Sequence, residues 1–231
     1  MTNLHSYYPV GVIIPNYVLN EWTTLTLVSI FAIACIAIFA ITSSIATNVN
    51  PRIRKTELST ALWFALCGAI HSILEGYYAL NFATLAGEQT LLAQLWKEYS
   101  MSDSRYLTSN SFVMCMETIT AVCWGPLSFL LVGLIITENP YRHPLQIIIS
   151  LGQLYGDVLY YSTCAFEFLV NGVEYSRPET YYFWGYFMLL NAFWIIIPSI
   201  LIFNSVRATA GAFADAGKRR AGTNGSAKKT L

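Results

Sequence analysis

Charged side chains are scarce in this chain of 231 residues, because Asp, Glu, Lys and Arg together make up only 11% of it. An average soluble domain carries about 25% charged residues. The 13 basic and 13 acidic residues give a formal net charge of +0, and basic residues cluster only in a short C-terminal tail. Nucleic acid is therefore not an expected partner, since its recognition needs a face of positive charge.

The chain also has few of the residues that metal and cofactor sites use. Its five cysteines are an odd number, all inside apolar runs, so they predict no disulfide framework. A metal site of His71, Glu75 and Glu117 is conceivable by ligand type, but the other two of the three histidines lie in predicted loops. No dinucleotide-binding, phosphate-binding or serine-hydrolase motif is found. We predict neither a metal nor a cofactor.

Long apolar segments are abundant, with 55% of the residues hydrophobic. A helix needs about 20 apolar residues to cross a bilayer. Five segments approach or exceed this length: 22–46, 58–82, 111–137, 144–169 and 181–206. We predict an all-α membrane protein, a bundle of five transmembrane helices enclosing an intramembrane cavity. The predicted parts are an N-terminal segment (1–21), a five-helix domain (22–206) and a basic tail (207–231).

The distribution of Lys and Arg predicts the orientation of the chain. Ten of them fall on the side of the C-terminal tail and three on the other side. By the positive-inside rule the tail is cytoplasmic and the N-terminus lumenal, so the sequon at Asn224 should carry no glycan. The last four residues, KKTL, resemble the dilysine signal of endoplasmic reticulum membrane proteins. The alternative is a solvated basic tail without a sorting role.

Ionisable residues interrupt the second, third and fourth apolar segments. Placing one charge at the centre of a bilayer costs at least about 2.5–3.5 kcal/mol, so such residues are rare and usually functional. On the second segment, Cys67, His71, Glu75 and Tyr78 follow one helical stripe. On the third segment a second stripe comprises Glu117, Thr120 and Trp124.

The last two segments carry polar stripes as well. The fourth contributes Gln153 and Asp157, and the fifth carries Trp184, Phe187, Asn191, Trp194 and Pro198. Polar side chains at bilayer depth face the bundle interior, so we expect the four stripes to point at one another. The first segment has no such residue, and we expect it to pack at the outside.

Two interpretations of these stripes remain open. Polar side chains can hold a membrane bundle together, at about 0.6 kcal/mol per hydrogen bond, and Asp157 could brace a neighbouring helix as readily as it could contact a substrate. The alternative is catalysis. Glu75 and Glu117 have one cationic partner between them, His71, so we expect one carboxyl to hold a proton. An acid beside a base is the arrangement of general acid–base catalysis.

Several stretches together resemble one known family. They are "CGAIHSILEGYY", "LLAQLWKEY", "DSRY", "METITAVCWGPLS", "GQLYGDVLYY" and "YFWGYFMLLNAFW". The sequence is similar from about residue 58 to 198 to the emopamil-binding protein family of sterol delta-8 to delta-7 isomerases. This resemblance implies five membrane helices, an endoplasmic reticulum location and a sterol substrate. The N-terminal region, the loop near 162–180 and the tail depart from the animal enzyme.

The resemblance also implies the site residues. It assigns catalysis to His71, Glu75, Glu117, Asn191 and Trp194, and a substrate contact to Thr120. The stripes add Tyr78, Trp124, Trp184 and Asp157 as further substrate contacts. In the expected mechanism, an acid protonates carbon 9 of the sterol and a base then removes a proton from carbon 7. We assign the acid to Glu117, positioned by His71, and the base to Glu75, oriented by Asn191, although coupled carboxyls could exchange these roles.

One further ligand class and two rival functions follow. A pocket that stabilises a buried carbocation should bind cationic amphiphilic amines as inhibitors, because their ammonium resembles the intermediate. A non-catalytic protein that binds sterols or amines would need the same cavity. A transporter is less favoured, because no inverted repeat is visible. The apolar first segment could face lipid or a second copy, which leaves a homodimer open.

Overall fold

The computed structural model describes residues 5–227, with side chains up to residue 220, and all regular elements in this part are helical. The α-helices are α1 (Thr24–Val49), α2 (Lys55–Ala69), α3 (Gly76–Asn81), α4 (Leu91–Tyr99), α5 (Ser111–Ile119), α6 (Gly125–Ile136), α7 (Arg142–Asn171) and α8 (Asn191–Ala227). Three π-helical segments are η1 (Ile70–Glu75), η4 (Thr120–Trp124) and η5 (Tyr181–Leu190). Two 3₁₀ turns are η2 (Leu85–Gly87) and η3 (Ser104–Leu107).

The π-helical segments join neighbouring α-helices into longer rods. Of the described residues, four rods are long and apolar enough to cross a membrane. They are Thr24–Val49, Lys55–Asn81, Ser111–Ile136 and Tyr181–Arg220, which match the first, second, third and fifth predicted segments. The fourth predicted segment forms α7, a helix of 30 residues that is not among these four. The predicted signal at Lys228 and Lys229 lies outside the described residues.

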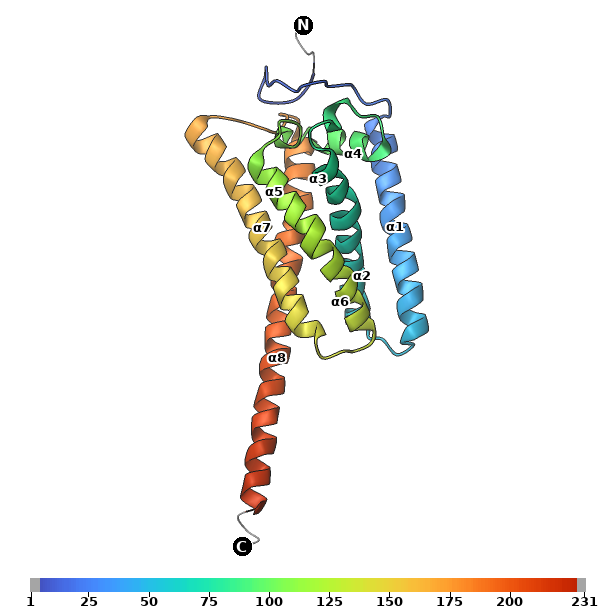
Figure 1. Ribbon diagram of the computed structural model, residues 1–231, viewed down its shortest axis with the longest axis vertical. Coiled ribbons are helices and arrows are strands. Elements are labelled where there is room, and N and C mark those ends of the chain that lie inside the picture. Colours follow the sequence, from blue (N-terminus) through green and yellow to red (C-terminus); the bar gives the residue numbers. More distant parts are fainter. Residues whose placement is uncertain (1–4, 228–231) are drawn as a thin grey trace.

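The rods lie side by side, with α1 at one edge (Figure 1). Helix α7 packs along α8, α2 packs against α6, and α1 contacts α2 and α4. Only 6% of the apolar window of α1 is buried, which confirms the expectation that the first segment packs at the outside. Helix α8 runs on well beyond the other rods (Figure 1). We call the end of the bundle near the N-terminal segment the N side and the opposite end the C side.

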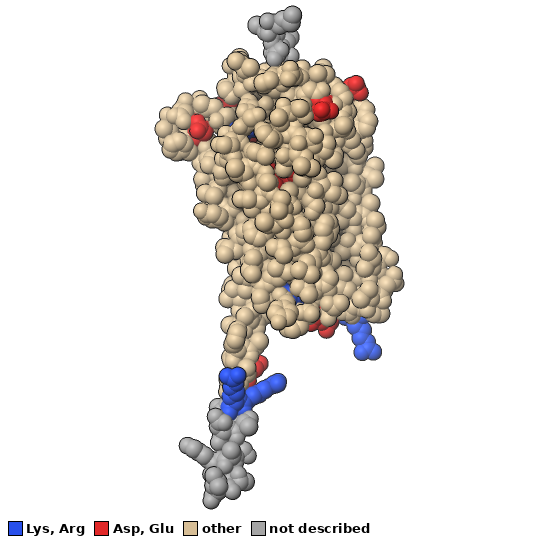
Figure 2. All heavy atoms as spheres, in the orientation of Figure 1, with Lys and Arg blue, Asp and Glu red and all other residues tan. Residues whose placement is uncertain are grey.

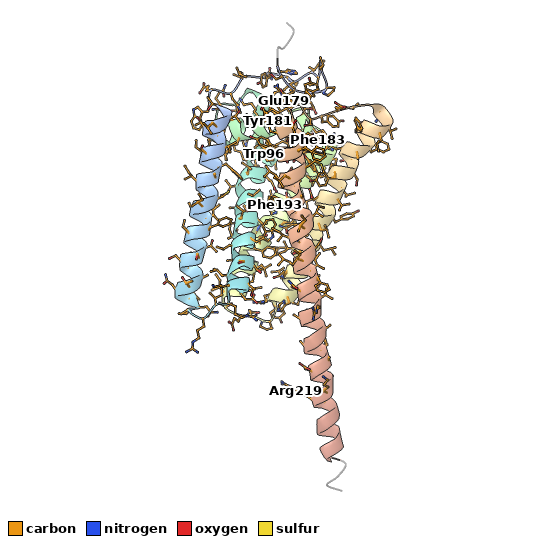
Figure 3. The ribbon with its side chains drawn as sticks, turned by 180° about the vertical axis from the view of Figure 1, so that it is seen from behind. Trp96, Glu179, Tyr181, Phe183, Phe193 and Arg219 are labelled. Carbon is orange, nitrogen blue, oxygen red and sulfur yellow. The ribbon has the colours of Figure 1, made fainter. Side chains whose placement is uncertain are left out.

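Charged residues on the face shown in Figure 2 lie mostly towards the two ends, and a broad band between them is largely uncharged. From behind, Glu179 and Tyr181 lie at the N side, whereas Arg219 lies far along α8 on the C side (Figure 3). An uncharged band around a helical bundle is what a hydrocarbon environment requires, since charge there is costly.

A cap formed by residues 5–23, α4 and η3 covers the N side (Figure 1). The Tyr7 hydroxyl donates to the Lys97 carbonyl oxygen at 2.8 Å, and the Trp96 indole donates to the Leu74 carbonyl oxygen at 2.8 Å. The Arg105 guanidinium pairs with Asp103 at 2.7 Å, and both side chains are buried. The cap is therefore a packed layer, fixed to the rod that contains η1.

The segments η1 and η4 pack against each other, and glycine makes this approach possible. A Cβ atom at Gly125 would lie 2.3 Å from the Ser72 Oγ atom and 3.1 Å from the Ser72 backbone nitrogen. Gly133 lies two turns further along α6, and a Cβ atom there would meet nothing within 4 Å. These two glycines therefore form a matched pair on one helix.

We expect Gly125→Ala to lower the thermal unfolding midpoint of the purified protein, because overpacking costs about 1–3 kcal/mol. Gly133→Ala should leave the midpoint unchanged or raise it, since alanine favours helix by about 1 kcal/mol over glycine. Adding Ser72→Ala to Gly125→Ala removes the closest atom and should recover part of the loss. A Gly125→Ala protein as stable as the Gly133→Ala control would contradict the close packing of η1 and η4.

Candidate active site

A cavity of about 870 Å³ lies between α1, the η1 rod, α4, the η4 rod, α7 and the η5–α8 rod. This volume falls within the usual range of small-molecule sites, about 300–1,000 Å³. Most of the lining side chains are apolar or aromatic. The polar and ionisable ones are Cys35, His71, Glu75, Glu98, Tyr99, Tyr106, Cys115, Glu117, Thr120, Gln153, Tyr155, Asp157, Tyr160, Tyr186 and Asn191. The cavity thus brings together residues from all four predicted stripes.

The segment η1 contains the first two predicted catalytic residues. Nδ1 of His71 lies 2.8 Å from Oε1 and 2.7 Å from Oε2 of Glu75. Both side chains are largely enclosed, with exposures of 4% for His71 and 12% for Glu75. A π-helical turn holds one more residue than an α-helical turn and often marks a functional site. This wider turn allows the imidazole to face both carboxylate oxygens.

Helix α7 provides the partner of the other imidazole nitrogen. Nε2 of Gln153 lies 3.1 Å from Nε2 of His71. With the amide in this orientation, Gln153 donates and His71 Nε2 accepts, so Nδ1 carries the proton that is donated to Glu75. A second-layer hydrogen bond of this kind fixes the tautomer of a histidine. The sequence shows that Gln153 is a polar residue in an apolar segment. Its role in orienting His71 becomes visible only from the distance between the two side chains.

Glu117 lies near the C-terminal end of α5, just before η4, and its carboxyl group interacts with that of Glu75. The Tyr106 hydroxyl of the cap donates to Glu117 Oε1 at 2.6 Å. Burial and the nearby Glu117 carboxylate hold the pKa of Tyr106 well above its ordinary value, so this phenol keeps its proton and remains a donor. His71 hydrogen-bonds to Glu75, whereas Glu117 accepts from Tyr106. The expectation that His71 positions Glu117 stays a prediction.

Four tryptophans line the cavity: Trp63, Trp96, Trp124 and Trp194. The ring centroid of Trp194 lies 6.5 Å from that of His71 and 5.3 Å from that of Trp63. Trp124 packs against α7, where a Cβ atom at Gly152 would lie 2.4 Å from its ring. Gly152 is therefore needed for the indole of Trp124 to lie against α7.

Asn191 lines the cavity, and its hydrogen bonds go to Phe187 and Tyr99 rather than to Glu75 as expected. Its Nδ2 atom donates to the Phe187 carbonyl oxygen at 2.7 Å and to the Tyr99 hydroxyl at 3.1 Å. Asn191 is the first residue of α8, directly after η5, where it can reach the Phe187 carbonyl one turn back. The amide is thereby tied to the cap through Tyr99. Thr120 also lines the cavity, and its hydroxyl donates to the Glu117 carbonyl oxygen at 2.8 Å.

Two predicted substrate contacts lie outside the cavity lining. Tyr78 is fully buried and packs on Trp96 and Tyr106, at centroid distances of 5.0 and 5.3 Å. Trp184 is 60% exposed on the outside of the bundle. The predicted stripe assumed α-helical spacing, whereas η5 is π-helical over residues 181–190. Each π turn holds more residues, so the seven-residue step from Trp184 to Asn191 does not return to the same face.

Asp157 lines the cavity on α7, one turn from Gln153 on the N side. The site residues that sequence reasoning missed are Tyr99 and Tyr106. Both belong to the cap, and no local pattern shows that a loop folds back over a bundle. Among the described residues, His, Cys, Asp and Glu form no cluster of three or more that could hold a metal ion.

Comparisons with known proteins identify relatives of this chain. Residues 91–205 match the family model described as EXPERA, the expanded EBP superfamily. A Mus musculus protein named 3-beta-hydroxysteroid-Delta(8),Delta(7)-isomerase is 44% identical over 207 residues, covering 88% of this chain and 88% of that protein. A probable isomerase of the same name from Arabidopsis thaliana is 32% identical over 200 residues, covering 86% of each chain. An isomeliandiol synthase of Ailanthus altissima is 34% identical over 208 residues, covering 90% and 93%.

These matches extend over most of the chain and include the segments that contain His71, Glu75, Glu117 and Trp194. The resemblance seen in the sequence is therefore confirmed, and the chain belongs to the emopamil-binding protein (EBP) family.

Proposed function

We propose that this protein is a sterol isomerase that moves a double bond from delta-8 to delta-7 without a cofactor. The names of its relatives support the reaction. The observation that carries the proposal is geometric: the His71–Glu75 pair and Glu117 face each other at an apolar cavity of about 870 Å³. An acid, a base and aromatic walls are what a proton-transfer isomerisation needs.

The proton steps follow from the hydrogen bonds. Tyr106 donates to one oxygen of Glu117, which leaves the other oxygen free to hold a proton and deliver it to carbon 9. The electron pair of the double bond forms the new C–H bond, and a cation develops at carbon 8. Glu75, which accepts a hydrogen bond from His71, then removes a proton from carbon 7, and the C–H electrons form the new double bond.

Two further features complete the cycle. The indole of Trp194 lies beside the His71–Glu75 pair, where its face can stabilise the cation at carbon 8. The carboxyl groups of Glu75 and Glu117 interact directly, so the proton taken from carbon 7 can return to Glu117 and reset the site. The overall reaction consumes and releases nothing, which agrees with a site that uses its own carboxyls alone.

We propose that α7 is the fifth membrane span. Its 30 residues give a length of about 45 Å at 1.5 Å per residue, and it packs along α8. Five spans place the N-terminus and the tail on opposite sides, and the excess of Lys and Arg assigns the tail to the cytoplasm. The cap is then lumenal, and the endoplasmic reticulum membrane is the proposed location. The exposed face of α1 is open to lipid or to a second copy.

The same cavity should bind cationic amphiphilic amines, since their ammonium would occupy the position of the cation beside the carboxyls and Trp194. A non-catalytic sterol-binding protein of this fold is the rival function. The complete set of Glu117, Glu75 and His71 favours the enzyme. Binding alone would not need two carboxyl groups that have different hydrogen-bond partners.

Turnover in heavy water is the first test. Purified protein with a delta-8 sterol should give the delta-7 sterol carrying one deuterium at carbon 9, since solvent deuterium reaches the acid before it reaches the substrate. Mass spectrometry and NMR of the product locate the label. Tight binding of an unchanged sterol by folded protein would favour the non-catalytic rival instead.

The second test removes each carboxyl separately. Glu75→Gln and Glu117→Gln should each reduce turnover by at least about 100-fold, the low end of the contribution of general acid–base catalysis. Glutamine nearly preserves the shape, so the unfolding midpoint reports whether each variant is folded. Near wild-type rates in either folded variant would refute the assignment of that carboxyl.

The third test concerns Tyr106, a site residue that was not predicted from the sequence. Tyr106→Phe deletes the hydroxyl that donates to Glu117, and kcat should fall by about 10- to 100-fold, as expected for a lost hydrogen bond to a charged group. Tyr141→Phe is the matched control, because Tyr141 is 73% exposed and remote from the cavity. An unchanged kcat and pH profile would show that Tyr106 only packs.

A further inference from the structure

One carboxyl in the cavity has no partner. Asp157 is 9% exposed, and its buried Oδ2 atom has no hydrogen-bond partner among the described residues. The other cavity carboxyls are all engaged. Glu75 is bonded to His71 and Glu117 to Tyr106, whereas Glu98 accepts from Thr24, Tyr182 and Tyr186. Burying an unpaired carboxyl is costly, so Asp157 is suited to a donor that arrives with the ligand.

The position of Asp157 indicates which donor this is. Gln153, which contacts His71, lies four residues before Asp157 on α7, a separation of about 6 Å along the axis. Asp157 therefore lies on the N side of the contact between Gln153 and His71, by roughly the width of one ring of a fused ring system. In a 3-beta-hydroxysteroid, the substrate class in the names of the relatives, the hydroxyl is on ring A and the reacting double bond borders ring B.

We propose that Asp157 binds the 3-hydroxyl group of the sterol and so determines the position of the double bond beside Glu75 and Glu117. This inference rests on the proposed isomerase function. The hydroxyl donates to Asp157 with ring A towards the N side. Most of the lining is apolar, so it cannot by itself prevent a flat hydrocarbon from sliding along the cavity. One polar contact at a fixed position determines where along the cavity the sterol binds.

The test compares two substrates in two proteins. The substrates are a delta-8 sterol with a free 3-hydroxyl and its 3-methyl ether, which cannot donate a hydrogen bond. The wild type should prefer the free hydroxyl by about 10- to 100-fold in kcat/KM, the range for a hydrogen bond to a charged group. Asp157→Leu removes the acceptor at similar volume and should abolish this preference, chiefly by raising KM for the free sterol.

Two controls accompany the comparison. Val158→Ala changes the neighbouring residue, which is 43% exposed and not part of the cavity lining, and it should keep the wild-type preference. Asp157→Asn retains an acceptor oxygen without the charge and should show an intermediate preference. It also serves as the second variant if Asp157→Leu fails to fold.

The outcomes separate this proposal from the proposed function. Equal turnover of both substrates by the wild type, or a full preference in folded Asp157→Leu, would overturn the role of Asp157 while leaving the isomerase intact. If the wild type isomerises neither sterol, the proposed function fails. In that case, the affinities of the wild type and of Asp157→Leu for the two sterols can be compared without turnover. The fluorescence of the cavity tryptophans reports the binding.

Discussion

Most of the architecture around the cavity depends on one constraint: two carboxyl groups and an imidazole are enclosed in a bundle with a largely uncharged surface. Each of these groups needs a hydrogen-bond partner, because the cost of an unpaired polar group rises when water is excluded. The partners come from separate parts of the chain. Helix α7 supplies Gln153 to His71, and the cap supplies Tyr106 to Glu117. The same hydrogen bonds that satisfy the proposed catalytic groups therefore also hold α7 and the cap against the η1 and η4 rods.

The π-helical segments give these groups their direction. In η1, the wider turn lets one imidazole nitrogen face both oxygens of Glu75, and in η4 it carries Trp124 to the cavity wall. Widening a helix costs regular hydrogen bonds, so neighbouring packing must hold it in place. The contact of Gly125 with Ser72 brings the two segments together, which links helix packing on the C side of the site to the geometry of the proposed acid and base.

The sequence predicted the helical rods closely, because a run of apolar residues determines a membrane helix almost alone. It also pointed to His71, Glu75, Glu117, Asn191 and Trp194, which all line the cavity, since ionisable and polar residues stand out in an apolar background. The hydrogen-bond partners were harder to predict. Helical-wheel spacing assumes an α-helix, and the π-helical segments change the face of every later residue, as Trp184 shows. The roles of Tyr99 and Tyr106 depend on a loop folding back over the bundle, which no periodicity encodes.

The cap has a chemical consequence beyond packing. A carbocation in contact with water is captured as an alcohol, so an isomerase must keep water away until the base removes a proton. Trp96 and Tyr106 stack at a centroid distance of 4.7 Å and both line the cavity from the N side. The residue that holds Glu117 is thus also part of the barrier to water. Loss of the Tyr106 hydroxyl would affect the acid, whereas loss of its ring would also open the cavity, and the second change should give hydrated sterol as a side product.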